Sequence, residues 1–151
     1  MNNYTIRVLE SNDYHKGFLQ LLERLTIVGD ISYDRFTRYL TNQNMNTTTY
    51  VIEEDIHKCL VATGTLLLEK KYTHNLSVVG HIEDIVVSKD YSGKGLGKHL
   101  MNYLTRVAEE NRCYKVILNC NKDKIGFYNS CEYVEKEVEM VKYFNDTGSN
   151  R

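Results

Sequence analysis

Residues 78–98 read VVGHIEDIVVSKDYSGKGLGK, a run of branched apolar residues followed by a glycine-rich segment. The first part, Val78–Val87, has the composition of a β-strand. The second part, Ser92–Lys98, precedes a helix that we expect to end near Asn111. One buried face of this helix is indicated by the spacing of Leu96, Leu100, Met101, Leu104, Val107 and Ala108. The stretch therefore predicts a strand that leads through a glycine loop into a helix.

The flanking regions predict alternating strands and helices. In chain order we expect a strand at Tyr4–Leu9, helices beginning at the caps Ser11 and Ser32, strands at Tyr50–Glu54, Cys59–Glu69 and Val78–Val87, the helix after Ser92–Lys98, a strand at Tyr114–Cys120, a short helix at Asp123–Ser130 and a last strand at Tyr133–Phe144. The order is β-α-α-β-β-β-α-β-α-β. The three central strands should form an antiparallel meander, with a hairpin turn at Asp55–Lys58. The strand–helix–strand step that follows requires a parallel crossover.

This order predicts an α/β fold, a mixed central sheet flanked by helices on both faces. A length of 151 residues fits one domain over residues 1–151, with a frayed tail from about residue 145.

Composition excludes several classes of protein. Lys and Arg total 19 and Asp and Glu total 20, a net charge of −1 that argues against bulk nucleic-acid binding. No apolar run is long enough to span a membrane, and the first residues lack the features of a signal peptide, so we expect a cytoplasmic protein. In that compartment Cys59, Cys113, Cys120 and Cys131 should be free thiols. No cysteine or histidine spacing indicates a metal site, and we expect none.

The glycine loop indicates an anion site. Successive N–H groups at a helix start, aided by the helix dipole, favour phosphate or pyrophosphate. Lys94 and Lys98 add positive charge. A Walker A loop is excluded, because His99 follows Lys98 where Ser or Thr is needed. Glycines at positions 93, 95 and 97 also do not fit the Gly-x-Gly-x-x-Gly spacing of a dinucleotide fold.

The run His81–Val87 followed by Tyr91–Lys98 resembles the acetyl-CoA motif of the GNAT family of N-acetyltransferases. The family motif is Gln/Arg-x-x-Gly-x-Gly/Ala after a strand, and this chain has Ser92 where the Gln or Arg stands. The resemblance implies the GNAT acyl-CoA N-acyltransferase fold and acetyl-CoA as co-substrate, without a metal. In the family this strand splays from its parallel neighbour, and its backbone pairs with the pantetheine. The implied cofactor-binding residues are Ile85, Val86, Val87, Gly93, Lys94, Gly95, Leu96, Gly97, Lys98 and Tyr128.

Further stretches resemble the branch of this family that acetylates the 2-amino group of glucosamine 6-phosphate, a step toward UDP-N-acetylglucosamine. They include Leu25–Gly29, Glu69–Lys71 with His74, Gly80–Ile85, Cys113–Leu118 and Phe127-Tyr128. The resemblance implies direct attack by the amine in a ternary complex and a homodimer, with the C-terminal strand packing across the interface. The implied catalytic residues are Glu83, Asp84, Asn119 and Tyr128. The implied substrate-binding residues are Thr26, Lys71, Tyr72, Thr73, His74, Glu83, Asp84, Tyr114, Lys115, Asn119 and Lys142.

Two positions depart from the pattern. Asn119 stands where many relatives have an acid, so it can accept a hydrogen bond but brings no charge. Lys142 lies one position before the Arg of the relatives, and alternation along a strand would point it to the opposite face. Two alternatives stay open at this point. One is a GNAT enzyme for another small amine, a lysine or a peptide amine, and the other is a non-catalytic acyl-CoA-binding module.

Overall fold

The computed structural model describes residues 3–144. Contacts divide the chain into two compact units, the first ending at Leu118 and the second beginning at Asn119. The expectation of a single domain over residues 1–151 stays a prediction, and the expected frayed tail from about residue 145 lies outside the described residues. Across residues 3–144, no helix combines the length and the apolar character needed to cross a bilayer.

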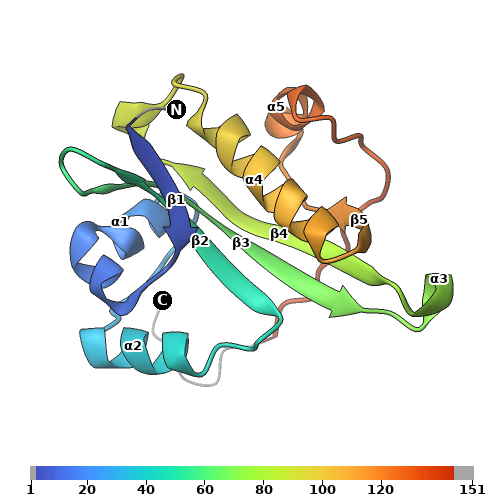
Figure 1. Cartoon of the computed structure of the whole chain (residues 1–151), viewed down its shortest axis with the longest axis horizontal. Helices are drawn as coiled ribbons and strands as arrows, with labels where there is room; N and C mark the ends of the chain where they lie inside the picture. The colour runs from blue at the N-terminus through green and yellow to red at the C-terminus, as the bar shows by residue number, and fades with distance from the viewer. Residues whose placement is uncertain (1–2, 145–151) are drawn as a thin grey trace. The chain divides into compact units, whose positions relative to one another are not determined.

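A five-stranded sheet forms the centre of the first unit (Figure 1). Its strands lie in chain order: β1 (Tyr4–Val8), β2 (Thr47–Glu54), β3 (Leu60–Lys70), β4 (Val78–Val87) and β5 (Cys113–Ile117). Strands β1 to β4 pair antiparallel, and β5 runs parallel to β4. The predicted meander and the predicted parallel crossover are therefore confirmed. Strand β2 begins before the predicted Tyr50, and β5 ends before the predicted Cys120.

The helices connect these strands. The first unit contains η1 (Ser11–Lys16), α1 (Phe18–Leu22), α2 (Tyr33–Thr41), α3 (Thr73–Leu76), η2 (Lys89–Tyr91) and α4 (Leu96–Glu110). The second unit contains η3 (Lys122–Lys124) and α5 (Ile125–Ser130). The predicted cap Ser32 is confirmed, since its hydroxyl accepts the Arg35 N–H at 3.4 Å. The predicted cap Ser11 is wrong. Glu10 precedes a 3-10 turn there, and Gly17, at φ 85°, separates that turn from α1.

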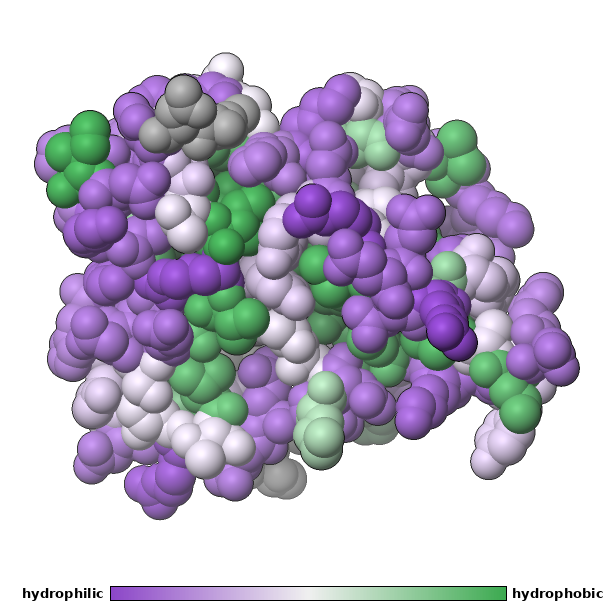
Figure 2. Space-filling view, in the orientation of Figure 1, coloured by the Kyte–Doolittle hydropathy of each residue, from purple (hydrophilic) through white to green (hydrophobic). Residues whose placement is uncertain are grey.

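Helices cover both faces of the sheet, as adjacent residues of β2 show. Tyr50 packs its ring against Tyr103 of α4, with centroids 5.3 Å apart. Val51, which points to the opposite face, lies in a buried cluster with Phe18 of α1 and Phe36 of α2. Apolar side chains are thus buried on both faces, and the surface seen in Figure 2 is mostly hydrophilic with separate apolar areas.

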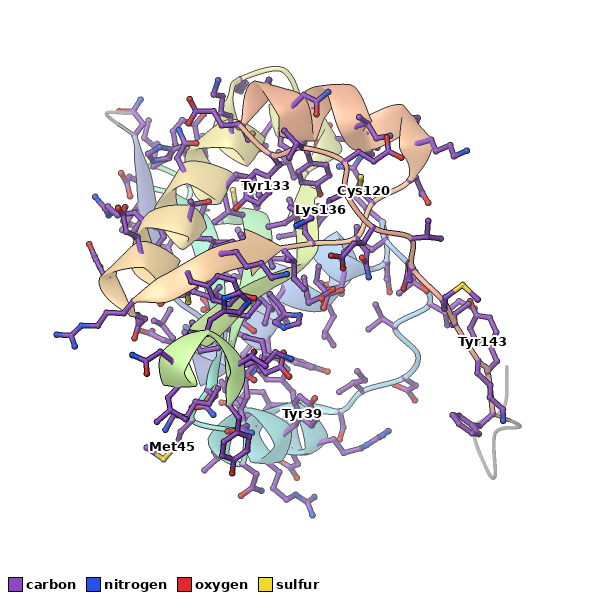
Figure 3. All side chains as sticks on the ribbon, turned by 90° about the vertical axis from the view of Figure 1, so that its right-hand side faces the viewer. Tyr39, Met45, Cys120, Tyr133, Lys136 and Tyr143 are labelled. Carbon is purple, nitrogen blue, oxygen red and sulfur yellow. The ribbon has the colours of Figure 1, made fainter. Side chains whose placement is uncertain are left out.

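The last predicted strand, Tyr133–Phe144, is wrong for this single chain: residues 133–144 contain no regular element. Their side chains are largely exposed, with Val138 at 86% and Tyr143 at 86%. Figure 3 shows Tyr143 on a stretch of ribbon without helix or strand. The physical reason is that an alternating sequence becomes a strand only where an edge pairs with it. Within the second unit no strand offers such an edge among the described residues.

Candidate active site

A bulge in β4 carries the acidic pair predicted to handle the amine. Thr65 pairs with Glu83 and Thr63 pairs with Val86, so two steps along β3 match three along β4. The additional residue is accommodated at Asp84, whose φ of 55° is left-handed, a conformation that Asp adopts more readily than most residues. Glu83 and Asp84 are both exposed. The bulge therefore presents two carboxylates to solvent in the middle of the sheet.

Gly64 faces this bulge across the β3–β4 pair. A Cβ at Gly64 would lie 2.3 Å from Cδ1 of Ile85, a distance that real atoms do not tolerate. The absent side chain lets Ile85 fold inward against Leu100 and Leu104 of α4, whose methyl groups lie 3.3 and 3.2 Å from the same point. Gly64 thus shapes the bulge by close packing.

The pairing between strands β4 and β5 ends just before this bulge. Their parallel pairing runs only from Val78↔Cys113 to His81↔Ile117, whereas β4 continues to Val87. The edge of β4 beyond His81 is therefore not paired with β5. This matches the splay that the family resemblance implies. The pairing of Ile85, Val86 and Val87 with pantetheine stays a prediction, and the Val87 carbonyl accepts a hydrogen bond from Arg24.

The glycine loop follows β4 and starts α4. Gly93 and Gly95 have φ of 75° and 77°, and Gly95 is the N-cap of the helix. No atom lies within 4 Å of a Cβ built at Gly93, so the backbone there is open to an approaching ligand. Leu96 is buried, which anchors the helix start, while Gly97 is half-buried and Lys98 exposed. The loop has the geometry of an anion cradle.

Lys94 is held beside this cradle by an aromatic ring. Its Nζ lies 4.5 Å from the ring centroid of Tyr91. The Tyr91 hydroxyl lies 3.6 Å from Sγ of Cys59, and this hydrogen bond raises the pKa of Tyr91 to about 12. Tyr91 therefore stays protonated at neutral pH and orients a neighbouring cation.

A second group of predicted site residues surrounds α3, at the far end of the β3–β4 hairpin (Figure 1). His74 stacks on Tyr114 with ring centroids 4.4 Å apart, and Nζ of Lys115 lies 5.7 Å from the same ring. Tyr72 and Thr73 are exposed, Tyr72 at 96%. The structure therefore brings His74, Tyr114 and Lys115 together.

Lys71 belongs to a separate ionic group that sequence reasoning did not single out. The Glu69 carboxylate accepts from Nζ of Lys71 at 2.5 Å and from Nε2 of His81 at 2.8 Å. Both contacts lower the pKa of Glu69, and the contact with Lys71 has the larger effect. Glu69 pairs with Val79 of β4, two residues before His81, so the register of the two strands was the pattern that could have revealed the contact.

The other predicted residues lie on loops or in the second unit. Thr26 is exposed in the loop after α1, where residues 23–29 line a shallow hollow. Asn119 is exposed at the start of the second unit. Tyr128 of α5 packs against Phe127, with centroids 5.0 Å apart, and against Tyr133 at 6.5 Å. Nζ of Lys142 lies 5.7 Å from the Phe144 ring.

Acid, histidine and cysteine side chains do not gather into a metal site anywhere in residues 3–144. The arrangement described above offers an anion cradle, an open strand edge and exposed carboxylates. Such a set suits transfer of a group from a phosphate-bearing carrier to an amine.

Comparison with known proteins connects this geometry to a family. Residues 12–133 match the acetyltransferase (GNAT) family. The chain is 44% identical to a glucosamine 6-phosphate N-acetyltransferase of Candida albicans, over 93% of this chain and 96% of that protein. The crystal structure of glucosamine-6-phosphate N-acetyltransferase from Arabidopsis thaliana gives a TM-score of 0.90 at 37% identity, covering 94% of this chain and 99% of that one. An acetyltransferase of Trypanosoma brucei gives 0.87 at 30% identity, covering 94% and 100%. The chain belongs to the GNAT family of acetyltransferases.

Proposed function

We propose that this protein transfers the acetyl group of acetyl-CoA to the 2-amino group of D-glucosamine 6-phosphate, giving N-acetylglucosamine 6-phosphate and CoA for UDP-N-acetylglucosamine synthesis. The observation that carries the proposal is the open edge of β4 leading into the glycine cradle of α4. The substrate is supported by the names of relatives that align over nearly the whole chain. A cytoplasmic location is part of the proposal, and the free thiols of Cys59, Cys113, Cys120 and Cys131 fit a reducing compartment.

Acetyl-CoA binds along β4 and across the start of α4. The segment Ile85, Val86 and Val87 pairs with the pantetheine arm through the backbone groups on its open edge, as a neighbouring strand would. The N–H groups from Gly93 to Lys98 hold the diphosphate, and Lys94 and Lys98 contribute charge. The open space at Gly93 and the left-handed φ of Gly93 and Gly95 support this fit, because a side chain there would obstruct the approach.

The chemistry needs a neutral amine and a good leaving group. Glu83 accepts the proton of the attacking amine, directly or through water, while Asp84 and Asn119 orient the amine. As the new C–N bond forms, N–H donors of β4 stabilise the charge on the thioester oxygen. The C–S bond then breaks, and Tyr128 donates a proton to the departing thiolate. The exposure of Glu83 and Asp84 at the bulge supports their role.

Cations and hydroxyls recognise the sugar phosphate. The proposed ligands of the sugar and its phosphate are Thr26, Lys71, Tyr72, Thr73, His74, Tyr114, Lys115 and Lys142. Support comes from the contacts of His74 and Lys115 with the ring of Tyr114, which hold an imidazole and an ammonium group close together. The contact of Lys71 with Glu69 keeps its ammonium near the end of β3.

The protein acts as a homodimer in this proposal. Residues 133–144 leave Val134, Val138 and Met140 more than 80% exposed. These residues fall on one side of an alternating pattern, as does Phe144, and burying them requires another surface. A second copy of the chain supplies it, with residues 133–144 as a strand across the interface.

A thiol-release assay tests the reaction. Protein and acetyl-CoA are offered glucosamine 6-phosphate, glucosamine, spermidine and a peptide amine in parallel. We expect CoA release with the sugar phosphate and far less with glucosamine, because glucosamine has no phosphate for the Lys115 ammonium and the neighbouring donors to bind. Turnover of spermidine or the peptide amine, but not of the sugar phosphate, would refute the substrate and leave another GNAT activity.

Tyr128→Phe tests the general acid. Because the phenol acts on the leaving group, we expect kcat to fall by about 10²-fold or more, with little change in KM for acetyl-CoA. Tyr133→Phe is the matched control, since Tyr133 packs beside Tyr128 in the same unit. Equal kcat in both variants would remove Tyr128 from the chemistry.

A further inference from the structure

Arg24, which follows α1, has a contact that none of the site assignments above explains. Its Nη1 donates a hydrogen bond to the carbonyl oxygen of Val87, 63 positions away, at 2.5 Å. Val87 is the last residue of β4, immediately before the turn and the glycine loop. The contact therefore brings a guanidinium to the junction between the strand and the anion cradle.

The side of β4 on which Arg24 lies follows from the backbone. The N–H of Ser88 donates to the Val61 carbonyl of β3 at 2.7 Å. The peptide between Val87 and Ser88 is trans, so the Val87 carbonyl points the opposite way, away from β3. That opposite edge is the one that β5 leaves unpaired beyond His81. Arg24 thus occupies the open edge on which the pantetheine arm is proposed to lie, at its diphosphate end.

The charge of Arg24 is available to a ligand. The contact with Val87 is to a neutral oxygen, and in the described part of the chain Arg24 makes no ion pair. A guanidinium has five N–H donors in a planar fork, so one bond to Val87 leaves a face for phosphate oxygens. Lys94 and Lys98 of the neighbouring loop carry compact ammonium charges and cannot supply such a fork.

We propose that Arg24 is a ligand of the diphosphate of acetyl-CoA, held at the open edge of β4 by the Val87 carbonyl. This inference rests on the acetyl-CoA binding proposed above. Because alternate residues of a strand face the same edge, it leaves the backbone of Ile85 and the N–H of Val87 for the pantetheine arm, since the Val87 acceptor is already engaged. It also provides a cation close to the loop in which this chain has Ser92 in place of the Gln or Arg of the family motif.

The test compares three acetyl donors that differ in phosphate content. Calorimetric titrations with acetyl-CoA and acetyl-3′-dephospho-CoA compare the wild type with Arg24→Gln and with Arg38→Gln. Arg38 is an exposed arginine of α2, and its variant is the control. S-acetylpantetheine, which lacks phosphate, is compared as an acetyl donor. We expect Arg24→Gln to weaken both nucleotide donors by about 10- to 100-fold and to leave the KM for S-acetylpantetheine unchanged. The double variant Arg24→Gln/Ser92→Arg should regain affinity, and Arg38→Gln should match the wild type.

Each other outcome overturns a stated claim. Equal affinity of Arg24→Gln and wild type would overturn the inference. A loss seen with acetyl-CoA but not with acetyl-3′-dephospho-CoA would assign Arg24 to the 3′-phosphate instead. A loss that extends to S-acetylpantetheine would make Arg24 a structural support of β4. Failure of the wild type itself to bind acetyl-CoA would refute the proposed function rather than the role of Arg24.

Discussion

At the scale of single residues, one carboxylate holds η1 against the sheet. Asp13 is fully buried, and its two oxygens accept from the guanidinium of Arg7 at 2.7 Å each. Glu53 of β2 contacts the same guanidinium and accepts from Nζ of Lys16 at 2.7 Å. Burial alone would raise the pKa of Asp13, but the hydrogen bonds from Arg7 and the Glu10 N–H outweigh it and lower the pKa. The pKa of Glu53 is also lowered, most strongly by its hydrogen bond with Lys16 and further by its hydrogen bond with Arg7.

Asp13→Asn should therefore destabilise the fold by about 1.5–3 kcal/mol, because a buried amide cannot accept both charged hydrogen bonds of Arg7, which keeps only Glu53 as an ionic partner. The pKa of Asp13 lies below its ordinary 3.8 and that of Glu53 below its ordinary 4.5. The contribution of each carboxylate to the free energy of unfolding is therefore complete above its ordinary value. It is lost as pH falls through the lower values of the folded state. Urea unfolding at pH 7, 5, 4 and 3 measures both effects, and the pH dependence should be shallower in the variant. Asp30→Asn, at an exposed position, is the control. Equal unfolding free energies for the two variants would contradict the role of Asp13.

At the scale of elements, the bulge of β4 depends on the missing side chain of Gly64. Gly64→Ala should cost about 1–3 kcal/mol by overpacking and should raise the KM for acetyl-CoA, because Ile85 is pushed out of its place. Removing Cδ1 of Ile85 removes the 2.3 Å contact, so Gly64→Ala/Ile85→Val should recover most of the loss. Chemical denaturation and steady-state kinetics measure the two effects.

Gly126→Ala in α5 is the matched control, since no atom lies within 4 Å of a Cβ there. This change should be neutral or slightly stabilising, as alanine is favoured in a helix. If Gly64→Ala behaved in the same way as Gly126→Ala, close packing would not be what shapes the bulge.

The elements that the sequence predicted are those with a local pattern. Branched residues place β4 at Val78–Val87, as observed, and the apolar stripe predicts α4 to within about a residue at its end. The break at Gly17 was missed, because an apolar stripe can continue across a single left-handed glycine. The site was predictable where it depends on local backbone, as in the glycine loop. The bulge at Asp84 and the contact of Arg24 with Val87 were not, because each depends on partners distant in the sequence.

At the scale of the whole molecule, the proposed dimer would account for the absence of a strand in residues 133–144 of the single chain. On one side of the alternating stretch, residues 134, 138, 140 and 144 are apolar and residues 136 and 142 are Lys. On the other side, residues 135, 137 and 139 are Glu, followed by Val141 and Tyr143. A second copy that supplied a pairing edge would bury the apolar side of the strand and leave the acidic side in water.

Val138→Lys should therefore convert the proposed dimer to a monomer, since it replaces a central apolar side chain by a third lysine on the same side. Light scattering coupled to size-exclusion chromatography measures the mass directly, with about 17.6 kDa expected for the monomer. Glu137→Lys, the adjacent change on the acidic side, should remain a dimer. For the wild type, specific activity should also fall on dilution below the dimer dissociation constant if the dimer is the active form. A wild type that is monomeric at every concentration and fully active would refute the dimer, and residues 133–144 would then need another partner to cover their apolar side.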